Sequence, residues 1–300
     1  MTKIISLFEN KVNLLIILFA LFVIIAGLVV LLDQFGLFGD KNDLSDKNSA
    51  AVPILMYHHF VDEGNPGTVI SAEMFDKQLA ALRDAGFTAI SFEELCAFVY
   101  DGVALPKRPI IITIDDGYMS VYETAFPILR KYNMKATVFI IGVSHGRSLY
   151  KGTQYPIIPR FDDAEAREMV ESGIISIQSH SYDMHQHEPY ETGPFRTGVL
   201  QMDGESREEY IQAFSEDFRR ASAQIEAMLG TPAFVYSYPF GRSSDLSEEL
   251  LHDFGVTATL TIVEGVNTVV RDTPESLFLL KRFNVPGDMT PEELLAKISG

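Results

Sequence analysis

The sequence predicts an α/β fold in which a parallel sheet closes, or nearly closes, into a (β/α) barrel. Three observations support it. Short apolar runs alternate with stretches of helical spacing in seven or eight units from Val52 onward. These runs are continuous in apolar residues, as in parallel strands whose outer face is covered. Roughly 250 residues suit one such barrel. A doubly wound open sheet fits almost as well, although no Gly-x-Gly-x-x-Gly follows the first run, which weakens a dinucleotide-binding form.

The first element is an apolar segment, residues 12–32, without a charge. It has the length that a helix needs to cross a membrane. A cleavable signal peptide would have a shorter apolar region and an A-x-A-like site, whereas this run leads directly into Asp33. A buried core helix is a further alternative, but such helices are seldom apolar on all faces. Because Lys3 and Lys11 precede the segment, we expect residues 1–11 to be cytoplasmic and the rest to lie outside the plasma membrane.

A spacer and one folded domain follow. Residues 33–50 are polar and rich in Gly, Asp and Asn, which is typical of a spacer, and the domain is expected at 51–300. Its expected strands are 53–57, 87–90, 109–114, 136–141, 174–179, 233–238, 256–262 and 276–283. The helical stretches between them are 73–85, 92–99, 121–132, 162–171, 205–229, 246–254 and 291–298.

Composition excludes several classes of protein. With 24 Lys+Arg against 41 Asp+Glu, the net charge is -17, so the phosphates of a nucleic acid would be repelled. The single cysteine, Cys96, excludes an internal disulfide framework and a cysteine-built metal cluster. Hydrophobic residues make up 47% of the chain and charged residues 22%, which excludes a disordered protein.

Polar residues follow four of the expected strands. Since reacting groups of a parallel (β/α) fold gather at the carboxyl ends of its strands, these residues should meet at one rim. They are His58 and His59, then Asp115, Asp116 and Gly117, then His180 to His185, and finally Pro239, Phe240 and Gly241.

Asp115 and Asp116 are the first candidates for a site. Two carboxylates this close cannot both stay ionised unless a cation neutralises one of them. One aspartate acting as a metal ligand and the other as a free base would resolve the conflict. The alternative is that an aspartate only caps the helix that follows.

His180 and His185 are the candidate imidazole ligands. Being five residues apart, they would not share a helix face, so the pair fits an irregular loop. Two imidazoles and one carboxylate form a recognised site for a divalent metal, which lowers the pKa of a water and polarises a carbonyl. His187 is an alternative to His185, and the spacing by itself is also common among structural histidines.

Three segments together resemble the polysaccharide deacetylases of the NodB-homology (carbohydrate esterase 4) family. They are TIDDG (113–117), HSYDMH (180–185) and SYPFG (237–241), and the resemblance covers about residues 52–299. The histidine spacing and PILMYHHF (53–60) look most like the poly-β-1,6-N-acetylglucosamine deacetylase branch. The resemblance implies a distorted (β/α) barrel of about seven strands, here preceded by a single N-terminal transmembrane helix, and one divalent ion, most often Zn²⁺.

The resemblance also implies roles for individual residues. The general base would be Asp115, and the metal ligands would be Asp116, His180 and His185. The backbone N–H of Phe240, which follows Pro239, would help to hold the oxyanion, and Ser181 would form a hydrogen bond in the loop that orients His180. In the poly-N-acetylglucosamine branch the general acid is a histidine after the first strand, a place held here by His58, with His59 as the alternative.

Three features of the family are missing. Ser237 stands where an arginine usually precedes the proline, an Asp-Trp motif cannot exist in a chain without tryptophan, and Leu-x-His is not found. The segment LLKRFN (279–284) offers Lys281 and Arg282 instead. Arg282 is a candidate to replace the missing arginine in orienting Asp115.

The function implied by the resemblance is that of a metal-dependent hydrolase of carbon–nitrogen bonds other than peptide bonds. It would remove acetyl groups from N-acetylated amino sugars of an extracellular or cell-wall polysaccharide that contains N-acetylglucosamine. An O-acetyl esterase acting on glycans and a non-catalytic glycan-binding homologue are the alternatives. Residues 187–206 are expected to form a loop of the groove wall, where Tyr190, Phe195 and Arg196 could contact sugar rings, or else a plain solvated loop.

Overall fold

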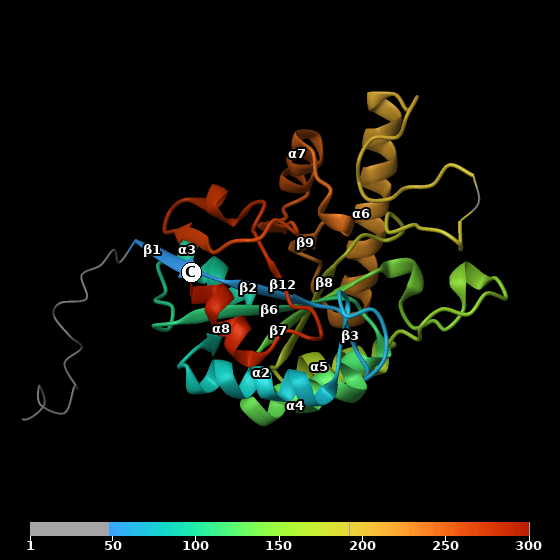
Figure 1. Ribbon diagram of the computed structural model, residues 1–300. Coiled ribbons are helices and arrows are strands. Elements are labelled where there is room, and N and C mark those ends of the chain that lie inside the picture. Colours follow the sequence, from blue (N-terminus) through green and yellow to red (C-terminus); the bar gives the residue numbers. More distant parts are fainter. Residues whose placement is uncertain (1–47, 192, 300) are drawn as a thin grey trace, which may run out of the picture. The chain divides into compact units, whose positions relative to one another are not determined.

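A parallel, curled sheet forms the centre of the computed structural model, which describes residues 48–191 and 193–299 (Figure 1). Its strand order is β10-β9-β8-β7-β6-β2-β12, and β5 also pairs with β6. The bounds are β2 Ile54–Tyr57, β5 Thr88–Ala89, β6 Pro109–Asp116, β7 Ala136–Ile140, β8 Ile175–Ser179, β9 Val235–Ser237, β10 Ala258–Leu260 and β12 Phe283–Asn284. From β2 to β10 the strands lie in sequence order, without the reversal of a doubly wound sheet.

The two edges of this sheet approach each other through one segment of the chain. Leu280 forms a parallel bridge with Leu260 of β10, and three residues later Phe283 pairs with Leu55 of β2. The sheet of about seven strands therefore fits the distorted barrel that was expected. The expected strand at 276–283 is wrong over most of its length, because Pro274–Leu277 forms a 3-10 turn and Leu279 has a φ of 54°.

The described residues contain seven α-helices, six of them between strands and the last after β12. They are α2 Ala72–Asp84, α3 Phe92–Tyr100, α4 Phe126–Tyr132, α5 Asp163–Glu171, α6 Arg207–Leu229, α7 Asp245–Asp253 and α8 Pro291–Ser299. Their ends agree with the predicted helical stretches to within two residues, except that the first part of 121–132 is a π-helix, Val121–Ala125. Local sequence explains where several of them begin. At the start of α3 the Ser91 side chain accepts the backbone N–H of Glu94, and the Glu94 side chain accepts the backbone N–H of Ser91. Asp162 and Ser206 begin α5 and α6 in the same way.

Two apolar clusters hold the sheet. In Figure 1, α2, α4, α5 and α8 lie together along its outer face, where Ile112, Ile114 and Val138 belong to one cluster with helix residues such as Leu79. Ile111 and Phe139 belong to the other cluster. Neighbouring residues of a strand thus face opposite sides, and all eight residues of β6 are buried, as expected for a parallel strand covered on both faces.

Short strand pairs lie outside the main sheet. The strand β1 (Ser49–Val52) pairs antiparallel with β11 (Asn267–Val270), so residues 49 and 50 are part of a sheet and not of the expected spacer. The strands β3 (His59–Phe60) and β4 (Val69–Ile70) form a parallel pair.

The predicted transmembrane helix at 12–32, the cytoplasmic residues 1–11 and residues 33–47 of the predicted spacer lie outside the described residues. Among the helices formed by residues 48–191 and 193–299, none combines the length and the apolar character that crossing a membrane requires.

Candidate active site

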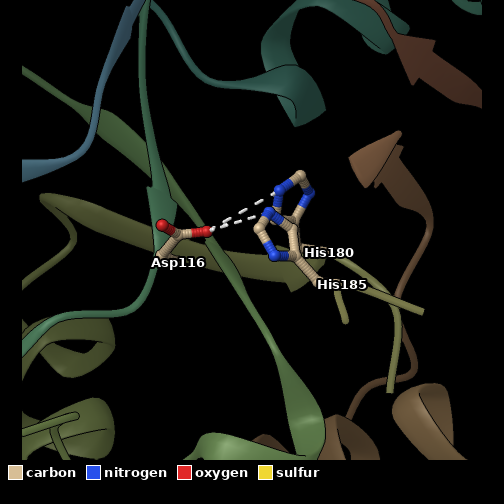
Figure 2. A group of neighbouring side chains, drawn as sticks. All are labelled: Asp116, His180 and His185. Atoms are coloured by element: carbon tan, nitrogen blue, oxygen red, sulfur yellow. Dashed lines mark ion pairs between the residues drawn. The ribbon is translucent and has the colours of Figure 1, made fainter. Parts of the chain in front are cut away.

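Three predicted ligands meet at the carboxyl ends of the strands. Asp116 ends β6, while His180 and His185 lie in the loop that follows β8. Their potential ligand atoms all lie within 4.8 Å of one another. Figure 2 shows Asp116 facing both rings: its Oδ1 lies 3.8 Å from Nε2 of His180 and 3.7 Å from Nε2 of His185.

The hydrogen bonds of this group leave its facing atoms available. Nδ1 of His180 donates to the backbone carbonyl of Ser237 at 2.7 Å, so that the lone pair of the neutral ring lies on Nε2. Within the described part of the chain, Oδ1 of Asp116 is buried and has no hydrogen-bond partner. A buried, unpartnered carboxylate oxygen opposite two imidazole nitrogens is a donor set that suits a divalent cation.

The electrostatics of the three side chains also fit a cation. Burial lowers the pKa of His185 to about 4 despite the opposing charge of Asp116, and burial likewise lowers the pKa of His180. Burial alone would raise the pKa of Asp116, but the basic side chains around it, with His185 and Arg160 first among them, together hold that pKa below its usual range. At neutral pH the group therefore consists of two neutral imidazoles and a carboxylate, the protonation states in which these side chains bind metals.

Backbone conformation turns these strand ends toward the site. Asp116, Ser181 and Phe240 have φ values of 75°, 74° and 56°, and each lies at or just after the end of a strand. Non-glycine residues in this left-handed region cost about 1–3 kcal/mol each and persist where the surrounding structure imposes them. One result is that His180 Nε2 lies 3.9 Å from Oδ2 of Asp115 as well as near Asp116, so both carboxylates face the same ring.

Arg282 contacts Asp115, as the sequence suggested. Its Nη1 and Nη2 donate to Oδ1 and Oδ2 of Asp115 at 2.8 and 2.9 Å, a bidentate pair in which the arginine is 0% exposed. Further bonds from Arg282 to Thr113 and to the carbonyl of Thr261 complete its surroundings. Burial by itself would raise the pKa of Asp115, but the charge and hydrogen bonds of Arg282, together with His180 and His58, hold that pKa below its usual value.

The two histidines after β2 have different surroundings. His59 already has partners: its Nδ1 is hydrogen-bonded to Oγ of Ser120 at 2.7 Å, and its ring packs against Tyr118. His58 is half-buried. Its positive form is one of the smaller causes that lower the pKa of both Asp115 and Asp116. His58 is thus close enough to affect both carboxylates electrostatically, and its role as general acid stays a prediction.

Phe240 and Ser181 support the loop that carries His185. The Phe240 ring packs on the His185 ring with centroids 4.2 Å apart, and Pro239 before it is buried. Oγ of Ser181 accepts the N–H of Met184 at 3.1 Å, so it forms a hydrogen bond within the loop, as expected. His187, the alternative ligand, is bonded through Nδ1 to the Glu188 carbonyl and is not in the ligand group.

Sequence reasoning missed Asp217. This buried carboxylate on α6 accepts the backbone N–H groups of Tyr182 and Asp183 at 2.8 and 2.6 Å, and so holds the loop between the two histidines. Its pKa is raised to about 6, chiefly by burial. A signal was present in the sequence, because Asp217 lies at helical spacing with Phe214 and Ala221 on the apolar face of the helix.

Comparisons with known proteins give a consistent result. The sequence model of the polysaccharide deacetylase family matches residues 102–259, more than half of the chain. That range includes the two aspartates, the two ligand histidines and Phe240, whereas His58 and Arg282 lie outside it.

Individual relatives are distant in sequence. The Bacillus subtilis protein YxkH is 28% identical, over 82% of this chain and 76% of its own length. A Staphylococcus aureus poly-beta-1,6-N-acetyl-D-glucosamine N-deacetylase is 29% identical over 39% of this chain, and the match spans only 38% of that protein. Among solved structures, IcaB from Ammonifex degensii has a TM-score of 0.68 and 25% identity, covering 83% of this chain and 97% of that one.

Proposed function

Because this chain belongs to the polysaccharide deacetylase family, we propose that it is a metal-dependent hydrolase that removes acetyl groups from N-acetylated amino sugars of a polysaccharide. The observation that carries the proposal is the group of Asp116, His180 and His185 beside the Arg282-paired carboxylate of Asp115. The staphylococcal relative is named for a polymer of N-acetylglucosamine, and we propose such a polymer as the substrate class.

The metal would be held by Asp116, His180 and His185, and we propose Zn²⁺, which suits nitrogen and oxygen ligands in this number. When bound, it would supply Lewis acidity, which polarises a carbonyl and makes a water more acidic.

The chain's own residues would carry the proton transfers. Asp115, kept ionised by Arg282, would take a proton from the water that adds to the acetamide carbon. The Phe240 N–H would donate to the oxygen on which negative charge develops. As the C–N bond breaks, a protonated His58 would give its proton to the leaving amine, and acetate is the other product. A proton-transfer residue typically contributes about 10²–10⁴-fold, and one oxyanion donor about 10²–10³-fold.

We further propose the place where this reaction occurs. Residues 12–32 would anchor the chain in the plasma membrane, with residues 1–11 in the cytoplasm and the domain at 51–300 outside, where cell-wall or secreted polysaccharide is available.

Acetate release is the test of this function. The full chain should release acetate from N-acetylglucosamine oligomers, linked β-1,6 or β-1,4. It should lose that activity with a chelator and regain it with added Zn²⁺. Asp115→Asn, which keeps the shape but not the basicity of the side chain, should lower the rate at least about 10²-fold. Full activity of Asp116→Ala would refute the scheme. Release from acetylxylan alone would indicate an O-acetyl esterase, and bound metal without release from any glycan a non-catalytic homologue.

A further inference from the structure

A cavity of about 140 Å³ lies beside the ligand group, and the proposed proton transfers do not use it. It shares Asp116 and His185 with that group, while Tyr150 and Tyr190 form another part of its lining. A molecule in this cavity would therefore contact the residues that surround the reacting acetamide.

Two loops build the aromatic part of the lining. Tyr150 lies in the chain that follows β7, and Tyr190 in the segment that follows β8. Their rings stack with centroids 4.9 Å apart at 29°, and the ring of His187 meets Tyr190 edge-on at 5.4 Å. The rings of Tyr150, Tyr190 and His187 therefore form one cluster, to which two separate loops contribute.

Ion pairs hold the two loops together without any ligand. Nζ of Lys151 lies 2.7 Å from Asp183 and also contacts Glu191, which in turn accepts the Tyr150 hydroxyl. Burial would lower the pKa of Lys151, but its bonds to Asp183 and Glu191 raise it above the usual value, so Lys151 stays charged. A wall that is already ordered loses little conformational entropy when a ligand binds.

The chemistry of the lining indicates a sugar ring. A pyranose has an apolar face of C–H groups and a rim of hydroxyls, and the cavity combines aromatic rings with the polar side chains of Arg160 and His187. Apolar surface continues outward from it, because Ile158 in the lining is 47% exposed and Tyr155 nearby is 65% exposed. Exposed apolar surface beside a polar site is typical of a ligand groove.

We propose that this cavity is a saccharide subsite. It takes the pyranose ring next to the sugar whose acetamide reacts, and Tyr190 is its main binding residue. This inference rests on the proposed function and adds to it, since an enzyme with such a subsite prefers oligomers to a monosaccharide.

Kinetics on a pentamer and on the monosaccharide test the subsite. The measured quantity is the ratio of kcat/KM for N-acetylglucosamine pentamers, β-1,6 and β-1,4, to kcat/KM for N-acetylglucosamine. Tyr190→Ala should lower that ratio about three- to tenfold, mainly through KM of the pentamer, as expected for one lost aromatic contact. Tyr190→Phe should restore the ratio, because the ring remains. Tyr100→Ala is the matched control: Tyr100 is 46% exposed on α3 and should behave as the wild type.

Binding measurements separate this inference from the proposed function. Calorimetry with the Asp115→Asn chain should give a Kd for the pentamer. Adding Tyr190→Ala to that chain should raise this Kd about three- to tenfold. Ile158→Glu changes an exposed residue of the lining and should also weaken pentamer binding. This second variant tests the subsite if Tyr190→Ala does not fold. If both variants keep the wild-type pentamer binding and the wild-type ratio of kcat/KM values, the subsite is wrong, although the proposed deacetylase activity still stands. If no N-acetylated sugar releases acetate, the deacetylase fails, and the calorimetry still decides the subsite.

Discussion

Asp115 and Arg282 are the residues on which the site most depends. Both are buried, and each oxygen of the carboxylate accepts a bond from the guanidinium. Removing one member of a buried ion pair leaves an uncompensated charge, which costs more than the pair itself contributes. The pair therefore links stability to the proposed chemistry.

We expect Arg282→Met to lower the free energy of unfolding by about 3–5 kcal/mol, since Asp115 is left charged and buried. Adding Asp115→Asn in that background should recover part of the loss, because no buried charge remains. Urea unfolding of the four chains measures the cycle. Equal stability of the single Arg282→Met variant and the double variant would contradict the argument.

Metal content distinguishes the two neighbouring histidines. His185→Ala should lose the bound metal, because one of three protein ligands is gone, whereas His187→Ala should retain it, since His187 is bonded to the Glu188 carbonyl outside the ligand group. Elemental analysis after dialysis gives the answer. Metal lost from the His187 variant and kept by the His185 variant would reverse the assignment.

At the scale of elements, α6 positions the loop between the ligand histidines. Asp217 faces the barrel from the middle of this helix, and two backbone N–H groups of the loop donate to it. The pKa of a buried carboxyl is raised because burial disfavours its charged form, and here it reaches about 6. The protonated form of Asp217 is thus favoured in the folded state more than in the unfolded one.

The pH dependence of stability follows from that shift. A raised pKa stabilises the fold below the unfolded value near 4, and this stabilisation is lost as pH rises through about 6. The difference in unfolding free energy between the wild type and Asp217→Asn should therefore fall by about 2 kcal/mol from pH 4.5 to pH 7. Urea unfolding with chelator present measures it, and Glu216→Gln, an exposed neighbour on α6, is the control. A difference that does not change with pH would show that Asp217 is ionised throughout.

At the scale of the whole domain, barrel closure brings the parts of the site together. The segment that holds Arg282 lies between Leu280, which bridges β10, and Phe283, which pairs with β2. It is far from Asp115 in sequence and reaches it because the two edges of the sheet meet there.

The membrane anchor at residues 12–32 stays a prediction, and cell fractionation tests it. Full-length protein should stay in the membrane fraction after alkaline carbonate, and protease added to intact cells should remove the domain. Ile24→Arg places a charge in the apolar segment, at a cost of about 2.5–3.5 kcal/mol, and should shift protein to the soluble fraction, whereas Leu44→Arg in the spacer should not. Protection of the domain from protease in intact cells would contradict the proposed orientation.

The sequence by itself determined the order of the central strands as far as β10, the order of the helices, and the polar residues at the strand ends. Those features depend on short windows: apolar runs, capping residues and turns act within a few residues of one another. Asp115, Asp116, His180 and His185 could be grouped together because parallel strands carry their carboxyl ends to one rim. The choice of Asp116 as the ligand came from the family resemblance. Arg282 could be suggested only because the family usually has an arginine at the position that Ser237 occupies in this chain.

Only the tertiary structure decided which distant side chains meet. The hydrogen bonds from Arg282 to Asp115 require the barrel to close. Those from the loop after β8 to Asp217 require α6 to pack against that loop. The stack of Tyr150 on Tyr190 likewise joins two loops with no pattern in common. Such contacts depend on the positions of whole elements, and local periodicity carries no information about them.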